Sequence, residues 1–206
     1  KLLILLFSIF FLSSPSVFAD DISDFSIEGI SIGDSLLDYM TEDEILEEIE
    51  LNKNEYFYLN EPYKYVSIYL FNYSSTYEAG LSFFIKNNST NKYINNKNEK
   101  YTILSIRGMK NYIEDFDSCI QKRDEIAADL SHVFPFAQKA EDFFKHGADP
   151  SGNSIVDGIY FRFESGGEGE VSCLNFEETF RTKVKWSEGL DVAIDSAEVV
   201  EWLSDH

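Results

Sequence analysis

The sequence has few basic residues for its length, with 17 Lys and Arg against 37 Asp and Glu in 206 residues, and its formal net charge is −20. Proteins that bind nucleic acid without sequence preference gain affinity from Lys and Arg on phosphates, so this balance argues against that class. An anionic membrane surface would repel the chain for the same reason. Hydrophobic residues make up 44% and aromatic residues 16% of the sequence, enough apolar surface to form a core.

A long apolar run is also missing. The run that follows Lys1 ends near Leu12, whereas a transmembrane helix needs about 20 apolar residues, so we expect no stable membrane span. Residues 1–19 instead have the pattern of a secretory signal peptide, with Val17 and Ala19 at the positions that a signal peptidase reads. We expect cleavage after Ala19 and a periplasmic or extracellular location. Loss of these 19 residues removes one Lys and no acid, so the charge becomes −21.

Cysteine is scarce, and Cys119 and Cys173 are the two in the chain. There is no Cys-x-x-Cys spacing, which leaves a thioredoxin-like motif or a zinc ribbon without support. In an oxidising compartment the pair predicts one disulfide. The alternative is that Cys119 is a free, reactive thiol at a helix N-terminus.

The first half of the mature chain has signals for two short helices followed by three strands. Asp34 or Ser35 can cap a helix that begins near Leu36, and Thr41 to Glu44 is a capping box that opens an acidic helix. Aromatic and β-branched residues then predict strands at 63–71, 77–86 and 101–108, with a polar hairpin loop at 87–100.

The second half has helix signals before further strands. A capping box that starts at Ser118 predicts a helix that Pro135 ends, and a short helix is predicted at Ala137 to His146 with Gly147 as its cap. The remaining predicted elements are strands at 155–163, 170–176 and 190–194 and a C-terminal helix capped at Asp195 or Ser196. Because strands and helices come in blocks, we expect one α+β domain over 20–206, with helices packed on a mostly antiparallel sheet.

The string Gly33-Asp34-Ser35-Leu36 resembles the opening block of the GDSL or SGNH hydrolases, which are esterases and lipases. The resemblance implies that Ser35 is a nucleophile, and the Asp-x-x-His that such an enzyme needs is present as Asp129 and His132. The chain differs from the family because it has no Gly-x-Asn-Asp block, and because Asp129 and His132 lie mid-chain in a predicted helix. We therefore favour helix capping as the role of Asp34 and Ser35.

Metal-ligand spacing is absent among the three histidines, His132, His146 and His206, and we assign no metal site. The turn that begins at Asp149 has oxygen-bearing side chains at alternate positions, as a calcium loop does, but Ser154 stands where an EF-hand needs glycine. An Asp-Pro/Ser-Gly turn is the simpler interpretation.

The acidic residues lie in two flanks around a basic middle. Residues 20–50 contain 12 acids and no base, residues 51–110 have a net charge of +4, and residues 111–206 have a net charge of −13. The flanks are either solvated surfaces that keep the protein soluble, or an acidic surface for a cationic partner or for divalent ions.

These features predict an exported, disulfide-bonded domain that acts by binding and has no catalytic residue and no cofactor. The expected partner is an unknown protein or a cationic ligand, and nucleic acid is not expected. In element order alone the chain is similar to small outer-membrane assembly lipoproteins, which implies an envelope-associated module. Two alternatives are a GDSL-like serine esterase or lipase and a divalent-cation-binding protein.

Overall fold

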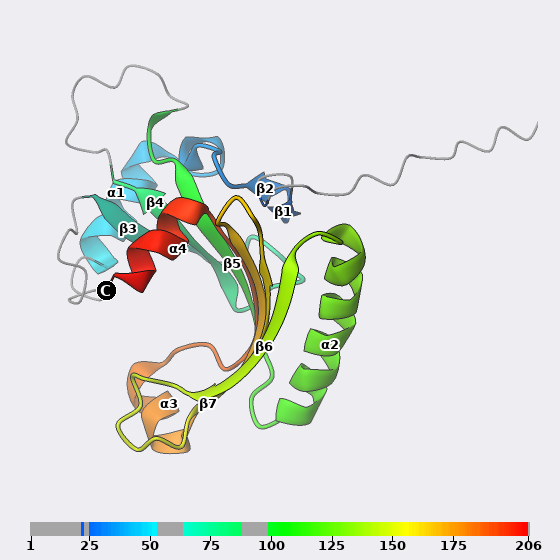
Figure 1. Ribbon diagram of the computed structural model, residues 1–206. Coiled ribbons are helices and arrows are strands. Elements are labelled where there is room, and N and C mark those ends of the chain that lie inside the picture. Colours follow the sequence, from blue (N-terminus) through cyan, green and yellow to red (C-terminus); the bar gives the residue numbers. More distant parts are fainter. Residues whose placement is uncertain (1–21, 23–24, 53–63, 88–98, 206) are drawn as a thin grey trace, which may run out of the picture.

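The computed structural model describes residues 22, 25–52, 64–87 and 99–205. These residues form a seven-stranded antiparallel sheet in the order β3-β4-β5-β9-β8-β7-β6 and a two-stranded sheet of β1 and β2 (Figure 1). The strands are β1 (Ser26–Ile27), β2 (Ile30–Ser31), β3 (Tyr65–Leu70), β4 (Gly80–Lys86), β5 (Ile103–Asn111), β6 (Gln138–Lys145), β7 (Ile155–Arg162), β8 (Glu168–Asn175) and β9 (Gly189–Asp195). The expected α+β class is confirmed.

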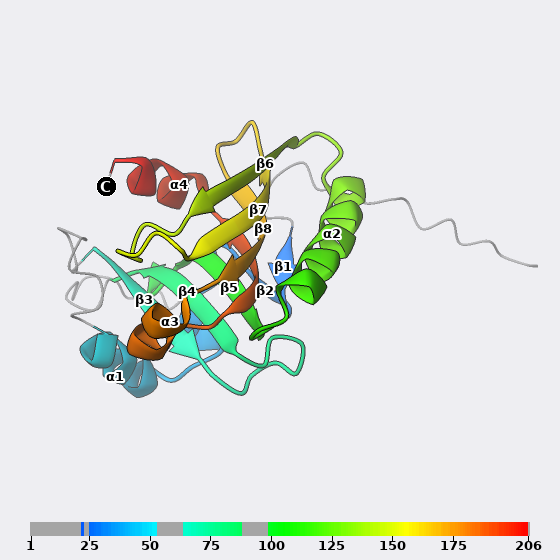
Figure 2. The ribbon, with the colours of Figure 1, turned by 90° about the horizontal axis from the view of Figure 1, so that it is seen from below.

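The helical elements lie on both faces of the large sheet. They are the 3-10 helix η2 (Leu36–Asp38) and the α-helices α1 (Glu42–Asn52), α2 (Phe116–Val133), α3 (Glu178–Val184) and α4 (Ala197–Ser204). Figures 1 and 2 show α2 on one side of the strands and α4 on the other. Among the described residues, no helix is long and apolar enough to cross a membrane.

The main core lies between the sheet and α2. Side chains of a strand alternate between its two faces, so Leu190, Val192 and Ile194 of β9 all point toward this core and are at most 3% exposed. Ile27 and Ile30 of the β1–β2 hairpin belong to the same core. A second, smaller core forms under α4 on the opposite face, from Tyr65, Leu104, Val199 and Trp202.

Two neighbouring contacts fix α2 to the sheet. Cys119 forms the expected disulfide with Cys173 of β8, with a Cα–Cα distance of 6.0 Å. One helical turn later, Arg123 forms an ion pair with Asp157 of β7. Asp157 and Cys173 are directly opposite each other in the β7–β8 register, so two successive turns of α2 are held by one cross-strand pair.

The prediction of a helix at Ala137 to His146 is wrong, because these residues form the edge strand β6. Gln138 to Lys145 pair in continuous register with Arg162 to Ile155 of β7. Ala, Lys and Glu in this segment suit a helix, but a regular ladder with β7 bonds alternate residues of the segment along its whole length. Gly147 therefore lies in the turn after the strand and caps no helix.

The prediction of Ser118 as a helix cap is also wrong. Helix α2 begins at Phe116, and the carboxylate of Asp115 accepts a hydrogen bond from the backbone N–H of Ser118 at 3.4 Å. Asp115 is itself a strong cap and lies three residues earlier, which places Ser118 in the first turn. Helix α3 was not predicted. The predicted signal peptide, 1–19, and most of the predicted loop at 87–100 lie outside the described residues.

We predict that replacing Cys119 and Cys173 together by Ala lowers the free energy of unfolding by about 2–4 kcal/mol, because a disulfide restricts the unfolded chain. Urea unfolding of the double variant and of the parent chain would measure the difference. Equal stabilities would contradict the structural role given to this bond.

Candidate functional site

The string Gly33-Asp34-Ser35-Leu36 forms a turn and a helix cap. Ser35 is 2% exposed, and its Oγ donates a hydrogen bond to the carbonyl oxygen of Lys100 at 2.7 Å. The same Oγ accepts from the backbone N–H of Leu37 at 3.3 Å, which makes Ser35 the N-cap of η2. The Asp34 carboxylate accepts from the Tyr39 hydroxyl at 2.8 Å. Burial and this hydrogen bond raise the pKa of Tyr39 to about 12.

The structure does not bring Ser35 together with Asp129 and His132. Both of these residues are exposed on the second half of α2, and neither is a hydrogen-bond partner of the Ser35 hydroxyl. A serine nucleophile must donate its proton toward a base, whereas this hydroxyl donates to a backbone carbonyl. The geometry therefore gives Ser35 a structural role in this conformation.

The capping box at Thr41 has both of its reciprocal bonds. Thr41 N–H donates to Glu44 Oε2 at 2.8 Å, and Glu44 N–H donates to Thr41 Oγ1 at 3.3 Å. Hydrogen bonds from Thr41 hold the pKa of Glu44 below its ordinary value. These contacts start α1 where the sequence predicts it.

The loop that starts at Asp149 uses its carboxylate oxygens internally. The Asp149 side chain accepts from the backbone N–H and the hydroxyl of Ser151 and of Ser154, at 2.7–2.8 Å. Burial opposes ionisation here, but these hydrogen bonds outweigh it and hold the pKa of Asp149 well below its ordinary value. Within the described ranges, no group of three or more His, Cys, Asp or Glu is placed to hold a metal ion.

A cluster of charged side chains, which the sequence patterns did not predict, lies on the sheet face opposite α2. At its centre Arg107 of β5 donates from Nη1 to Asp191 Oδ2 and from Nη2 to Glu170 Oε2, both at 2.9 Å. Arg107 and Glu170 both stand opposite Ala193, on the strand between them. Because the Ala193 side chain is a single methyl group, the guanidinium can pass over β9 to reach β8.

Asp195 completes this set, which we call the Arg107 cluster: Arg107, Glu170, Asp191 and Asp195. Burial raises the pKa of Asp191 and of Asp195 to about 6, although the positive charge of Arg107 lowers both pKa values. Three carboxyl groups around one guanidinium leave the cluster net negative at neutral pH.

A groove of about 400 Å³ opens beside the Arg107 cluster on the same face, and Asp191 belongs to both. Its walls are mostly aromatic and aliphatic, and Phe71 and Trp186 on its sides are 60% and 48% exposed. The lining residues are Tyr69, Phe71, Ala79, Met109, Asn111, Leu174, Phe176, Lys185, Trp186, Ser187 and Asp191. Large exposed aromatic rings around a hollow are typical of binding sites.

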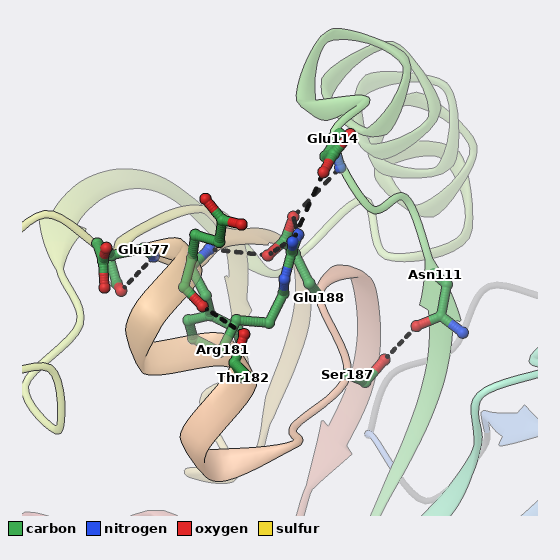
Figure 3. A network of polar contacts seen from close by, with 10 residues as sticks. Asn111, Glu114, Glu177, Arg181, Thr182, Ser187 and Glu188 are labelled. Carbon is green, nitrogen blue, oxygen red and sulfur yellow. Dashed lines mark hydrogen bonds and ion pairs between the residues drawn. The ribbon is translucent and has the colours of Figure 1, made fainter.

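The wall that carries Trp186 is held by a polar network, drawn in Figure 3. Arg181 of α3 donates from Nη1 to both carboxylate oxygens of Glu188 at 3.2 Å, and its Nη2 lies 3.7 Å from Glu114. Glu188 is 3% exposed and also accepts from the backbone N–H of Phe176 at 3.3 Å. The Ser187 hydroxyl donates to Asn111 at 3.2 Å. These contacts anchor Ser187 and Glu188, which follow Trp186 in the chain, and so set the position of the Trp186 indole ring.

A cluster of aromatic rings packs against Trp186 and supports the same wall of the groove. The imidazole of His146 lies 5.2 Å from the Phe176 ring and 5.6 Å from the Trp186 ring, and Phe180 packs on Trp186 at 5.7 Å. Burial lowers the pKa of His146. The imidazole packs among these aromatic rings as part of the groove wall.

One signal for these missed residues does exist in the sequence. In β8, polar residues alternate with apolar or small ones, at Glu168, Glu170 and Ser172. In β9, Asp191 and Asp195 lie four residues apart and so on the same face. This alternation predicts a polar face on each of the two strands. The strand order that makes these two faces adjacent to Arg107 has no such local signal.

Comparison with known proteins places the chain in no family, because no family model, no curated protein and no solved structure matches it.

We predict that Ser35→Ala lowers the free energy of unfolding by about 1–2 kcal/mol, because it removes the η2 cap and leaves the Lys100 carbonyl without its donor. Chemical unfolding measures this loss of stability. The matched control is Ser165→Ala, at an exposed position, which should change the free energy of unfolding by less than about 0.5 kcal/mol. Short-chain esterase activity in the parent that disappears in Ser35→Ala would contradict the capping role.

We also predict a change in pH dependence for Asp195→Asn. The pKa of Asp195 is about 6 in the folded protein, above its ordinary value, so between about pH 4 and 6 the folded state holds the proton that the unfolded state has lost. This contribution to stability is present at low pH and decreases as pH rises, by at most about 1.4 kcal/mol per pH unit.

The stability of the variant relative to the parent should therefore rise by about 1–3 kcal/mol between pH 4 and pH 7. Urea unfolding at a series of pH values measures it, with the exposed Asp129→Asn as the matched control. A stability difference that does not vary with pH would refute the prediction.

Proposed function

We propose that the chain is a non-catalytic binding module, acting in the periplasm or outside the cell, that takes a cationic ligand on the sheet face opposite α2. The ligand chemistry that fits is a peptide segment with an aromatic or aliphatic side chain next to Lys or Arg. The apolar side chain enters the groove, and the basic side chain lies against the carboxylates of the Arg107 cluster.

The observation that carries this proposal is that the groove and the cluster share Asp191. Phe71 and Trp186 present apolar surface that water covers in the free protein, and its burial favours binding. Asp191 lines the groove and binds the same guanidinium as Glu170. A Lys or Arg side chain beside Asp191 meets the net negative charge of the Arg107 cluster, and Trp186 lines the same groove, which together attract a cation although Lys185 also lines the groove.

Three further observations support a binding role. Two carboxylates of the cluster, those of Glu170 and Asp191, are tied to Arg107, and the buried Ser35 hydroxyl is tied to a backbone carbonyl. The net charge of −20 favours approach of a cationic partner from a distance. The disulfide is compatible with an oxidising compartment, and the signal-peptide pattern of residues 1–19 favours export.

The experiment titrates the mature chain with the amidated tripeptide Lys-Phe-Lys and with its acidic counterpart Glu-Phe-Glu, using isothermal calorimetry. We expect binding of the basic peptide and none of the acidic one. Trp186→Ala should weaken binding by more than about tenfold, because a central aromatic anchor typically contributes about 2 kcal/mol. Asp191→Asn should also weaken binding of the basic peptide, and the difference in affinity between this variant and the parent should become smaller at high salt.

Two matched controls separate the groove from surface charge and exposed aromatic area in general. Asp129→Asn removes one exposed acid from α2, and Phe136→Ala removes a ring that is 74% exposed outside the groove. Both should leave the affinity unchanged. Equal binding of the two peptides, or affinities unaffected by Trp186→Ala, would refute the proposed site.

A further inference from the structure

The edge strand β6 has an open row of backbone groups. His146 N–H donates to the Ser154 carbonyl at 2.9 Å, and this bond shows which residues of β6 have their backbone groups directed toward β7. In an antiparallel ladder alternate residues bond to the same neighbour, so the even-numbered residues of β6 bond to β7. The N–H and C=O groups of Lys139, Glu141, Phe143 and Lys145 therefore point to the outer edge, where the described part of the chain adds no further strand.

This edge has the form of a strand that can accept another. Its eight residues pair with β7 without a bulge, and none of them is proline. Helix α2 packs against β7, β8 and β9, and in the described part of the chain every residue of β6 except Ala140 is exposed. Phe143 is 62% exposed and Phe144 is 41% exposed. An open, regular edge that carries exposed aromatic rings is a surface for strand addition.

The charges on β6 determine which partner strand fits. When two copies pair antiparallel about a twofold axis, the residue on the axis faces itself, and its neighbours face each other in pairs. A register centred on Glu141 opposes Glu141 to itself. A register centred on Asp142 opposes Asp142 to itself and Lys139 to Lys145. Both registers place like charges opposite each other, which destabilises a sheet.

The register centred on Phe143 is complementary instead. It opposes Glu141 of each copy to Lys145 of the other, which gives two ion pairs, and it stacks the two Phe143 rings at the axis. The outward backbone groups of these residues then form bonded pairs. A register centred on Ala140 also matches charges, Lys139 with Glu141, but it leaves Phe143 opposite Ala137, outside the strand.

We propose that a second copy of this chain pairs with β6 in the Phe143-centred register, which joins two seven-stranded sheets into one continuous sheet. The groove residues lie on other elements, so this pairing leaves the proposed ligand site open. Failure of one of these two proposals therefore does not affect the other.

Sedimentation equilibrium of the mature chain at physiological ionic strength tests the pairing. We expect a monomer–dimer equilibrium in the parent. Glu141→Lys and Lys145→Glu, made singly, should each raise the dissociation constant by at least about tenfold, because each turns two attractive pairs into two repulsive ones. The double variant Glu141→Lys with Lys145→Glu restores both pairs and should restore the dimer.

The matched control is Lys183→Glu, which makes the same charge change at an exposed position on α3 and should leave the dimer intact. A second measurement reads the register directly. Phe143→Cys should give a disulfide-linked dimer on mild oxidation, since the two Cα atoms meet at the axis, and Ala140→Cys should not.

The proposal is overturned by a parent chain that stays monomeric up to its solubility limit. It is overturned equally by a dimer that the single charge reversals leave unchanged, by a double variant that stays monomeric, or by crosslinking through Ala140→Cys in place of Phe143→Cys.

Discussion

The disulfide between Cys119 and Cys173 is the constraint from which the two faces of the sheet follow. It fixes Cys173 toward α2, and because side chains of a strand alternate, Ser172 and Glu170 must point to the opposite face. Strand β9 pairs with β8 in register, so its own alternation follows, with Val192 toward α2 and Asp191 away from it. One covalent bond between a helix and a strand thus fixes which side chains of β8 and β9 point into the core beside α2 and which lie on the opposite face.

The face opposite α2 is divided between packing and polar surface. At one end α4 places Trp202 on Tyr65, with ring centroids 5.1 Å apart, and this closes a small apolar core. At the other end the segment that joins α3 to β9 carries Trp186. Between them Arg107 lies among three carboxylates. A buried carboxylate without a cation would be costly, so Arg107 is what allows β8 and β9 to carry acids at their centres.

The sequence predicts the elements whose signals are local and misses those that depend on a distant partner. The hairpin of β7 and β8 is predictable because alternation and a Ser-Gly-Gly turn coincide. Residues 137–146 suit a helix by composition, and the pairing with β7 alone makes them a strand. Helix α3 has β-branched residues and only seven positions, and it depends on the Glu177 cap and on Arg181 binding Glu188.

The same distinction applies to the candidate site. The capping bonds of Ser35 and Thr41 reach only two and three residues along the chain, so these roles are visible as spacing. Arg107 lies 63 residues from Glu170 and 84 residues from Asp191, and their contact requires the strand order β5-β9-β8. That order places a late strand between two earlier ones, and hydrophobic periodicity does not encode it.

The strong negative charge and an edge-to-edge dimer are compatible because they act over different distances. Repulsion between two chains of charge −20 is screened within about 8 Å at physiological ionic strength, whereas Glu141 and Lys145 would meet in direct contact. Charged side chains on an edge strand normally discourage pairing with another chain. On β6 they oppose like charges in the Glu141- and Asp142-centred registers and match in the Phe143-centred one. The charges of β6 therefore disfavour the Glu141- and Asp142-centred registers, and the position of Phe143 favours the Phe143-centred register over the Ala140-centred one, which also matches charges.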